Sequence, residues 1–236
     1  MKQRNSTDRE ESHMNRKKPQ LSMHLNKNES ALDVLIRADM EECDVSGFLF
    51  SDETVEHLNI SDVEIAGCIF INCRFYDCVF EGVSFSNCVF KNCDLSFMNM
   101  TQGAVSCTEI IESNISGLNL TFGVMNHVLV KSTACRYVNF SELRMMETSF
   151  VGCDLTSGNI DRARLKETQF VQCDLTGADF SHSSLRGMDL RGNRIDKIVF
   201  LGGELEGTTI DYGQAIALVK LLGIDVVDNR GVGGAF

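Results

Sequence analysis

The chain has 236 residues and carries 22 Lys and Arg against 33 Asp and Glu, a formal net charge of −11 at pH 7. That length allows one large domain or two small ones, and the acidic balance argues against a globally basic nucleic-acid-binding protein. The sequence contains neither a run of about 18 apolar residues nor a signal-peptide core, so we expect a cytoplasmic protein without a membrane span.

The first 30 residues differ from the rest in charge and in pattern. They contain seven basic and four acidic residues, with scattered Ser and Asn and no apolar period. Segments of this composition do not bury enough apolar surface to fold. We therefore predict a disordered tail over 1–30 and an N-terminal cap over 31–42.

A repeat of five residues begins at Val45 and continues without a break to Ile210. Every residue in this range whose number is a multiple of five is apolar, which gives 34 positions in succession. Two residues before most of these central positions the side chain is small, as in Cys93-Asp94-Leu95. A period of five fits neither the 3.6-residue period of a helix nor the alternation of a simple strand.

The period of five has a direct structural consequence. Residues two apart in an extended segment point the same way, so the small and the central side chains both face inward. The remaining residues must turn the chain at a corner, and each unit then forms one side of a coil. Stacked coils make a solenoid in which each coil contacts only its neighbours. Residues 43–212 are predicted to form this all-β solenoid.

This pattern resembles the pentapeptide-repeat family, whose consensus is Ala-Asp/Asn-Leu-x-x. The resemblance implies a right-handed quadrilateral β-helix with four units in each coil. The 34 units would then make about 8.5 coils and a rod roughly 41 Å long, at ~4.8 Å between paired strands.

The cysteines and histidines could be catalytic residues or metal ligands, but their positions in the repeat have a simpler structural explanation. Eight of the ten cysteines occupy the small inward position, Cys135 is central, and only Cys107 lies off both columns. Small buried thiols explain this placement better than zinc ligands, because a spacing of five puts successive cysteines on different sides of the coil. The five histidines lie off the inward columns and are predicted at the surface. We expect no catalytic residue, cofactor or metal, and hence a protein that is not an enzyme.

Acidic residues are unevenly distributed along the repeats. Residues 44–130 hold eleven acids and two bases, whereas residues 131–212 hold twelve acids and ten bases. One interpretation is a solvated surface kept soluble by charge. The other is a rigid acidic rod that imitates duplex DNA, which carries one charge per about 1.7 Å. Under the second interpretation the candidate partner-binding residues are Asp44, Asp52, Glu56, Asp62, Glu64, Asp77, Glu81, Asp94, Asp154 and Asp174.

One side of the predicted coils also presents apolar residues outward. They flank the central residues at 70, 90, 110, 130, 150 and 170 and are Ile69, Ile71, Val89, Ile111, Leu129, Val151 and Val171. Branched residues favour strands, and this preference alone can explain them. A contact surface is the alternative.

The period ends after Ile210. Residues 214–222 predict a short helix ended by Gly223, and residues 224–227 predict a short strand. A helix this short needs packing to persist, so we expect it to cap the rod and to use its remaining apolar surface for a two-fold interface. We predict dimerisation through residues 213–227 and a flexible tail over 228–236. The candidate interface residues are Tyr212, Ile216, Val219, Leu222 and Ile224.

The C-terminal segment also resembles one particular group within this family. Asp211-Tyr212-Gly213-Gln214-Ala215, followed by Leu221-Leu222-Gly223-Ile224, looks like the ending of the Qnr-type quinolone-resistance proteins, and Phe75-Tyr76-Asp77 is also similar. That resemblance implies a C-terminal dimer, a duplex-like acidic surface, and binding to DNA gyrase or topoisomerase IV that protects them from fluoroquinolones. Many Qnr-type proteins have two loops that interrupt the coils. Here the register never breaks, although units 51–57 and 101–107 are weak enough to hide a loop.

Two functions are therefore expected. The first is a non-enzymatic DNA mimic that binds type II topoisomerases and itself, with no direct contact to nucleic acid or membrane. The second is a structural scaffold that docks a different protein through the apolar side.

Overall fold

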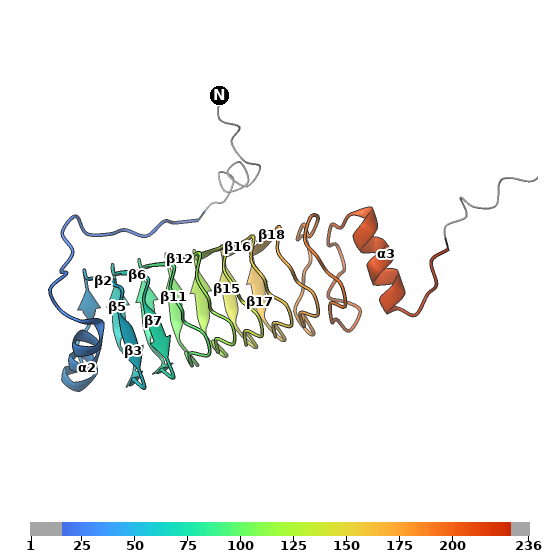
Figure 1. Cartoon of the computed structure of the whole chain (residues 1–236). Helices are drawn as coiled ribbons and strands as arrows, with labels where there is room; N and C mark the ends of the chain where they lie inside the picture. Colours follow the sequence, from blue (N-terminus) through green and yellow to red (C-terminus); the bar gives the residue numbers. More distant parts are fainter. Residues whose placement is uncertain (1–15, 228–236) are drawn as a thin grey trace, which may run out of the picture.

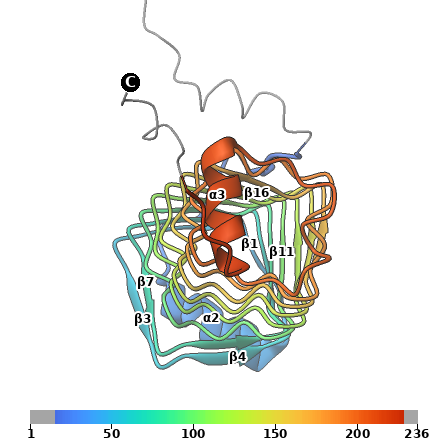
Figure 2. The same ribbon diagram turned by 90° about the vertical axis from the view of Figure 1, so that its right-hand side faces the viewer.

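The five-residue period winds the chain into four-sided coils that stack into a rod (Figures 1 and 2). The computed structural model of the chain describes residues 16–227. Each coil takes 20 residues, as the parallel register shows: Phe70 pairs with Phe50 on one side and with Phe90 on the other. The predicted β-solenoid is confirmed.

Two sides of the rod are continuous parallel sheets of seven strands. The first face consists of β1 (Val45–Ser46), β5 (Glu64–Ala66), β9 (Ser84–Ser86), β11 (Ala104–Ser106), β13 (Val124–Asn126), β15 (Arg144–Met146) and β17 (Arg164–Lys166). The second face consists of β2 (Leu49–Ser51), β6 (Ile69–Ile71), β10 (Val89–Lys91), β12 (Glu109–Ile111), β14 (Leu129–Lys131), β16 (Ser149–Val151) and β18 (Gln169–Val171).

The other two sides form strands only near the N-terminal end. The third face begins with β3 (Thr54–Glu56) and β7 (Arg74–Tyr76), and the fourth with β4 (Asn59–Ser61) and β8 (Val79–Glu81). Beyond them the residue before the central position is often Asp or Asn, whose side chain accepts a hydrogen bond from the backbone two residues on. Asp94 Oδ1 accepts from the Ser96 N–H (3.1 Å) in this way. Such Asx turns replace strands by single bridges, which keep the 20-residue register as far as Thr209.

At many of the corners, a residue whose backbone has a positive φ, in the left-handed region, turns the chain from one side to the next. Glycine fills some of these corners, but Asp, Asn and even Phe fill others, among them Asp52 (φ 59°) and Phe97 (φ 58°). The corner N–H donates to the carbonyl of the following coil, for example Phe97 N to Ser116 O (2.8 Å). These inter-coil hydrogen bonds offset part of the cost of the left-handed conformation.

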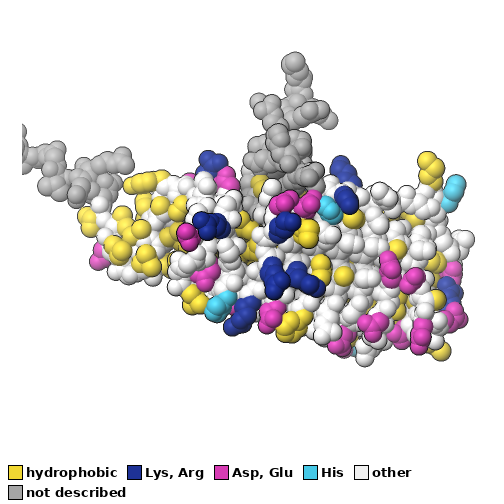
Figure 3. Space-filling model, turned by 180° about the vertical axis from the view of Figure 1, so that it is seen from behind, with side chains coloured by type: hydrophobic (Ala, Val, Ile, Leu, Met, Phe, Trp, Pro, Cys, Tyr) yellow, Lys and Arg dark blue, Asp and Glu magenta, His cyan; other side chains and the backbone are white. Residues whose placement is uncertain are grey.

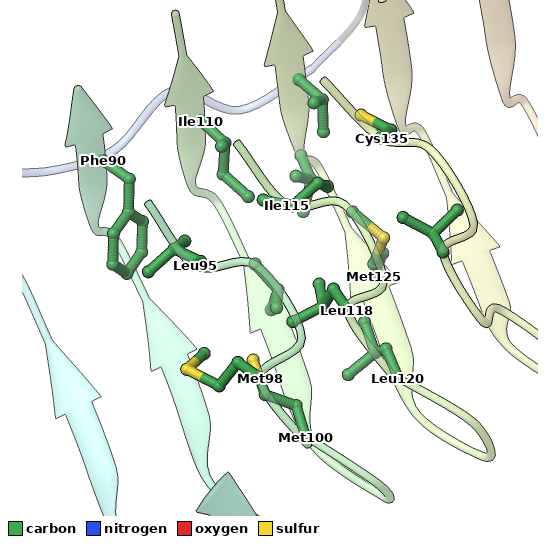
Figure 4. Packing of buried hydrophobic residues seen from close by; sticks show 14 of the residues in the cluster. Phe90, Leu95, Met98, Met100, Ile110, Ile115, Leu118, Leu120, Met125 and Cys135 are labelled. Atoms are coloured by element: carbon green, nitrogen blue, oxygen red, sulfur yellow. The ribbon is translucent and has the colours of Figure 1, made fainter. Parts of the chain in front are cut away.

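The interior is filled by the central side chains. The Phe70 and Phe90 rings stack with centroids 4.6 Å apart. Further along, the side chains of Leu, Ile and Met take over and point into the rod from successive coils (Figure 4). The last central residues, Phe200, Leu205 and Ile210, are only half-buried.

The five-residue register is also unbroken at the two units that are weak enough in sequence to hide a loop. Strand β3 occupies the weak unit at 51–57 and β11 occupies the one at 101–107, so neither unit forms a loop. Two residues of the small column do not follow the expectation. Cys43 is exposed because it precedes the first strand of the solenoid, and Gly203 is exposed near the C-terminal end of the rod.

Helices lie at both ends of the rod (Figure 1). Helix α2 (Ala31–Glu41) begins at Ser30, whose side chain accepts a hydrogen bond from Asp33 N, and buries Ala31, Val34, Leu35 and Ala38. Helix α3 (Tyr212–Leu221) begins at the Asp211 capping box, and Gly223 follows its end at φ +74°. The strand expected at 224–227 does not form, because no neighbouring strand pairs with this segment among the described residues. The tail expected at 228–236 lies outside the described residues.

Residues 16–28 form a segment that we call the N-terminal strap. It runs back along the rod beside the second face (Figure 1). Asn26 N donates to Gly47 O (2.8 Å) near the N-terminal end of the rod, and Arg16 bonds Glu109 several coils further on. The disordered tail predicted for 1–30 is therefore wrong for residues 16–30, because polar side chains on the coils hold this segment. Residues 1–15 lie outside the described part. Between residues 16 and 227, no helix has the length and apolar character needed to cross a bilayer.

Candidate partner-binding surface

Seven of the ten predicted acidic residues lie on the N-terminal coils, and all seven are exposed. Asp52, Asp62 and Asp77 stand at left-handed corners. The others flank central residues on the sides of the coils: Asp44, Glu56, Glu64 and Glu81. We call these seven residues the acidic end. Figure 3 shows Asp and Glu side chains gathered toward the end that carries α2, whereas Lys and Arg lie toward the middle and the opposite half.

No Lys or Arg side chain neutralises the acidic end within the described residues. Asp52 Oδ1 accepts from Asn72 Nδ2 (2.8 Å), and Glu64 Oε1 accepts from the Ser86 hydroxyl (3.2 Å). Asp77 Oδ2 lies 2.9 Å from His57 Nδ1. The negative charge of this surface therefore remains available to a cationic partner.

The other three predicted acids share the third face, as expected, but have structural roles. Asp94, Asp154 and Asp174 each accept a hydrogen bond from the backbone two residues on, and each lies within 4 Å of an arginine on the same face. Partial burial would raise the pKa of Asp154, but hydrogen bonds from Thr156 and Arg136 outweigh it and lower the pKa below its usual value. These three residues are half-buried turn residues with little free charge.

Charge density along the axis can be compared with that of DNA. Residues 44–130 have a balance of −9 over about 4.4 coils, or roughly 21 Å at ~4.8 Å per coil. For these coils alone that is one net charge per about 2.3 Å, compared with about 1.7 Å for a duplex. With the four basic residues of the strap, which lies along the same coils, the balance is −5, or one net charge per about 4.2 Å. The strap adds Arg16, Lys17, Lys18 and Lys27 beside the second face. The unneutralised acids of the acidic end lie mainly on the other sides and corners.

The strap is the feature of this surface that the sequence did not indicate. Its Arg16 side chain is 8% exposed and its Nη2 donates to Glu109 Oε1 (2.9 Å). Lys17 N donates to His127 Nδ1 (3.3 Å), and Gln20 N donates to Asn87 Oδ1 (3.1 Å). His127 is consequently buried, which corrects the prediction that all histidines lie at the surface.

The outward apolar residues lie beside this strap on the second face. Leu129 and Val151 are buried although they point away from the core, while Ile69, Ile71, Val89, Ile111 and Val171 are half-buried. Glu109, which holds Arg16, stands in register with Leu129. The apolar side is therefore partly covered in the chain itself.

The cysteine thiols are free and mostly inaccessible. Burial raises the pKa of Cys88 to about 12. A hydrogen bond from the Cys93 thiol lowers the pKa of Cys73 to about 7, but Cys73 is 2% exposed and no substrate can reach its sulfur. Among the described residues, no group of three or more His, Cys, Asp and Glu is arranged to hold a metal ion.

The C-terminal helix leaves much of its apolar surface open. Gln214 is its one buried residue, and its Nε2 donates to the carbonyls of Leu190 (2.6 Å) and Asn193 (2.8 Å). Of the predicted interface residues, Tyr212, Leu222 and Ile224 are exposed, and Ile216 and Val219 are half-buried. Leu221, Val226 and Val227 extend the exposed apolar surface.

Comparisons with known proteins agree with the coil geometry. The profile for pentapeptide repeats in eight copies matches residues 60–102, and the profile for a pentapeptide-repeat region matches residues 143–215. No curated protein matches the sequence.

Several solved structures are similar in shape. A trypsin-treated variant of QnrB1, described as a plasmid-mediated fluoroquinolone resistance protein, is 21% identical with a TM-score of 0.43, and the match covers 76% of this chain and 99% of that chain. Full-length QnrB1 is 19% identical with a TM-score of 0.33, covering 75% and 100%. HetL, a pentapeptide-repeat protein of the cyanobacterium Nostoc sp. strain PCC 7120 involved in heterocyst differentiation regulation, is 12% identical with a TM-score of 0.37, covering 71% and 91%.

The matched segments lie on either side of residues 103–142, and the strand pairing carries the same 20-residue register through that interval. The five-residue period, the four-sided coils and the two profile matches therefore lead to one conclusion: the chain is a pentapeptide-repeat protein.

Proposed function

We propose that this chain is a non-enzymatic mimic of duplex DNA that binds DNA gyrase and topoisomerase IV and protects them from quinolones. The observation that carries the proposal is the acidic end: seven exposed carboxylates on a rigid rod, without neutralising Lys or Arg partners among the described residues. A protein that binds DNA presents a basic groove. A rigid rod with an acidic end can occupy that groove with little loss of conformational entropy.

The sequence resemblance supports this choice of partner. Phe75-Tyr76-Asp77 includes Asp77 of the acidic end, and the Qnr-like ending forms α3 and the turn after it. The loops of many Qnr-type proteins are missing, because strands occupy both weak units. Contact with the topoisomerase would then come from the coils themselves.

A homodimer is part of the same proposal. The exposed apolar residues of α3 and the segment after it lie at the opposite end of the rod from the acidic end (Figure 1). A two-fold contact there would bury those residues and leave an acidic end at each extremity of the dimer.

Supercoiling by purified gyrase tests the proposal. The full-length protein is titrated into reactions with and without a fluoroquinolone at an inhibitory concentration. We expect restored supercoiling in the presence of the drug. Inhibition without rescue would support DNA mimicry but contradict protection, and no effect on gyrase or topoisomerase IV would contradict both.

The outward apolar residues of the second face favour a second function, that of a scaffold for another protein. These residues extend over several coils, and Ile69, Val89 and Ile111 among them are half-buried. The strap lies beside it, so a partner would have to bind next to the strap or replace it. Recovery of other proteins and no topoisomerase in a pull-down would favour this function.

A further inference from the structure

The edge between the third and fourth faces carries three exposed aromatic side chains. Tyr76 is 58% exposed, Phe97 76% and Tyr137 64%. We call these three residues the aromatic edge. It follows the corner between β3, β7 and β4 in the cross-section of the rod (Figure 2). These exposed rings lie outside the core and are accessible to a partner.

The position of Phe97 depends on a glycine in the next coil. Gly117 occupies the same corner one coil later, and a Cβ added to it would lie 2.5 Å from Phe97 Cδ1. The ring therefore leans over Gly117 in the space that a larger side chain would fill. Phe97 itself has φ 58°, in the left-handed region that disfavours bulky residues. Gly117 thus leaves room for the Phe97 ring, which is 76% exposed at this corner.

Carboxylates surround the N-terminal part of this edge. Glu56 stands in register with Tyr76 on the neighbouring strand, and Asp77 occupies the same corner as Phe97 one coil earlier. The His57 ring packs edge-on against Tyr76 at 5.8 Å, and its Nδ1 lies 2.9 Å from Asp77 Oδ2. Each of the two rings therefore has an acidic residue at the corresponding position one coil earlier, Glu56 for Tyr76 and Asp77 for Phe97.

We infer that Tyr76 and Phe97, together with Glu56 and Asp77, anchor arginine or lysine side chains of the bound protein. Ring faces attract cations through their quadrupole, and nearby carboxylates strengthen that attraction. The same carboxylates repel phosphate, so the ligand is a basic protein surface and not a nucleic acid. This inference rests on the proposed function, because it names the contact by which the acidic end holds its topoisomerase.

Affinity for purified DNA gyrase, measured by biolayer interferometry with the full-length protein, tests the inference. Phe97→Ala should weaken binding about tenfold, the size of one desolvated cation–π contact. Phe122→Ala is the matched control. Phe122 is also an exposed corner phenylalanine, 53% exposed with φ 61°, but it lies on the edge between the fourth and first faces. The control should change affinity less than about twofold.

Two further variants distinguish a cation–π contact of the ring from simple burial of its apolar surface. Phe97→Trp should retain the affinity of the wild type, whereas Phe97→Leu should lose as much as Phe97→Ala. Equal affinities for the wild type, Phe97→Ala and Phe122→Ala would overturn the inference and leave the proposed function standing. No binding by the wild type itself would contradict the proposed function instead. A change in the molar mass of Phe97→Ala in solution would also overturn the inference, by showing that a second copy covers the edge.

Discussion

At the scale of the residue, the inward small positions have little spare volume. A Cβ on Gly123 would lie 2.6 Å from Gly103 O and 2.9 Å from Leu120 Cδ1. The first of these atoms belongs to the backbone of the adjacent coil, which cannot move without disturbing the ladder of hydrogen bonds. Gly203 has open space instead, with nothing within 4 Å of an added Cβ.

Gly123→Ala should therefore destabilise the rod. Overpacking of this kind costs about 1–3 kcal/mol, which lowers the melting temperature of a chain of this length by roughly 2–10 °C. Gly203→Ala, the control, should change the free energy of unfolding by less than about 0.5 kcal/mol. Thermal unfolding followed by circular dichroism measures both. An unchanged melting temperature for Gly123→Ala would show that the coils adjust to fill this column.

At the scale of the element, α3 covers the end of the rod incompletely. Leu222 is 66% exposed, and it is followed by exposed Ile224, Val226 and Val227. These exposed apolar side chains at one end of the rod support the proposed two-fold interface. Helix α2 at the other end differs, because it buries four residues against the first coils.

At the proposed dimer interface, Leu222→Glu should prevent association and leave a monomer. A buried unpaired carboxylate at a two-fold interface is introduced twice, which makes association unfavourable. Light scattering should then give the 26.2 kDa of one chain in place of twice that mass. Met40→Glu, on α2 and also highly exposed, should leave the mass unchanged. A wild type that is already monomeric would contradict the proposed interface.

At the scale of the whole molecule, the sequence predicts the rod far better than it predicts the surface. The central positions repeat every five residues because each must fill the same interior, and this constraint is visible in the sequence alone. The strap could not be predicted in this way. Single side chains on distant coils hold it, such as Asn87 and His127, and such contacts leave no periodic signal.

The candidate site could likewise be predicted from the sequence only in part. The sequence correctly places Asp94, Asp154 and Asp174 on one face, but it does not show that arginines on that face neutralise them. Those pairings depend on which residues stack 20 apart and on the rotamers that they adopt. Phe97 and Tyr137 of the aromatic edge also lacked a sequence signal, because they lie off the central positions that repeat every five residues.

The proposed binding of the acidic end to type II topoisomerases can be tested by measuring the affinity of a charge-reversal variant for gyrase. The N-terminal variant changes Asp52, Asp62 and Asp77 together to Lys. A control variant changes Glu142, Glu167 and Glu206 to Lys, which alters the net charge equally at exposed positions in the other half of the rod. Circular dichroism is used to check that both variants keep the fold.

We predict that the N-terminal variant binds gyrase at least about 100-fold more weakly than the wild type, because like charges placed against a basic groove cost several kcal/mol. The control should bind within about threefold of the wild type. Equal affinities for the two variants would contradict the account, because binding would then depend on net charge or on another surface and not on the acidic end.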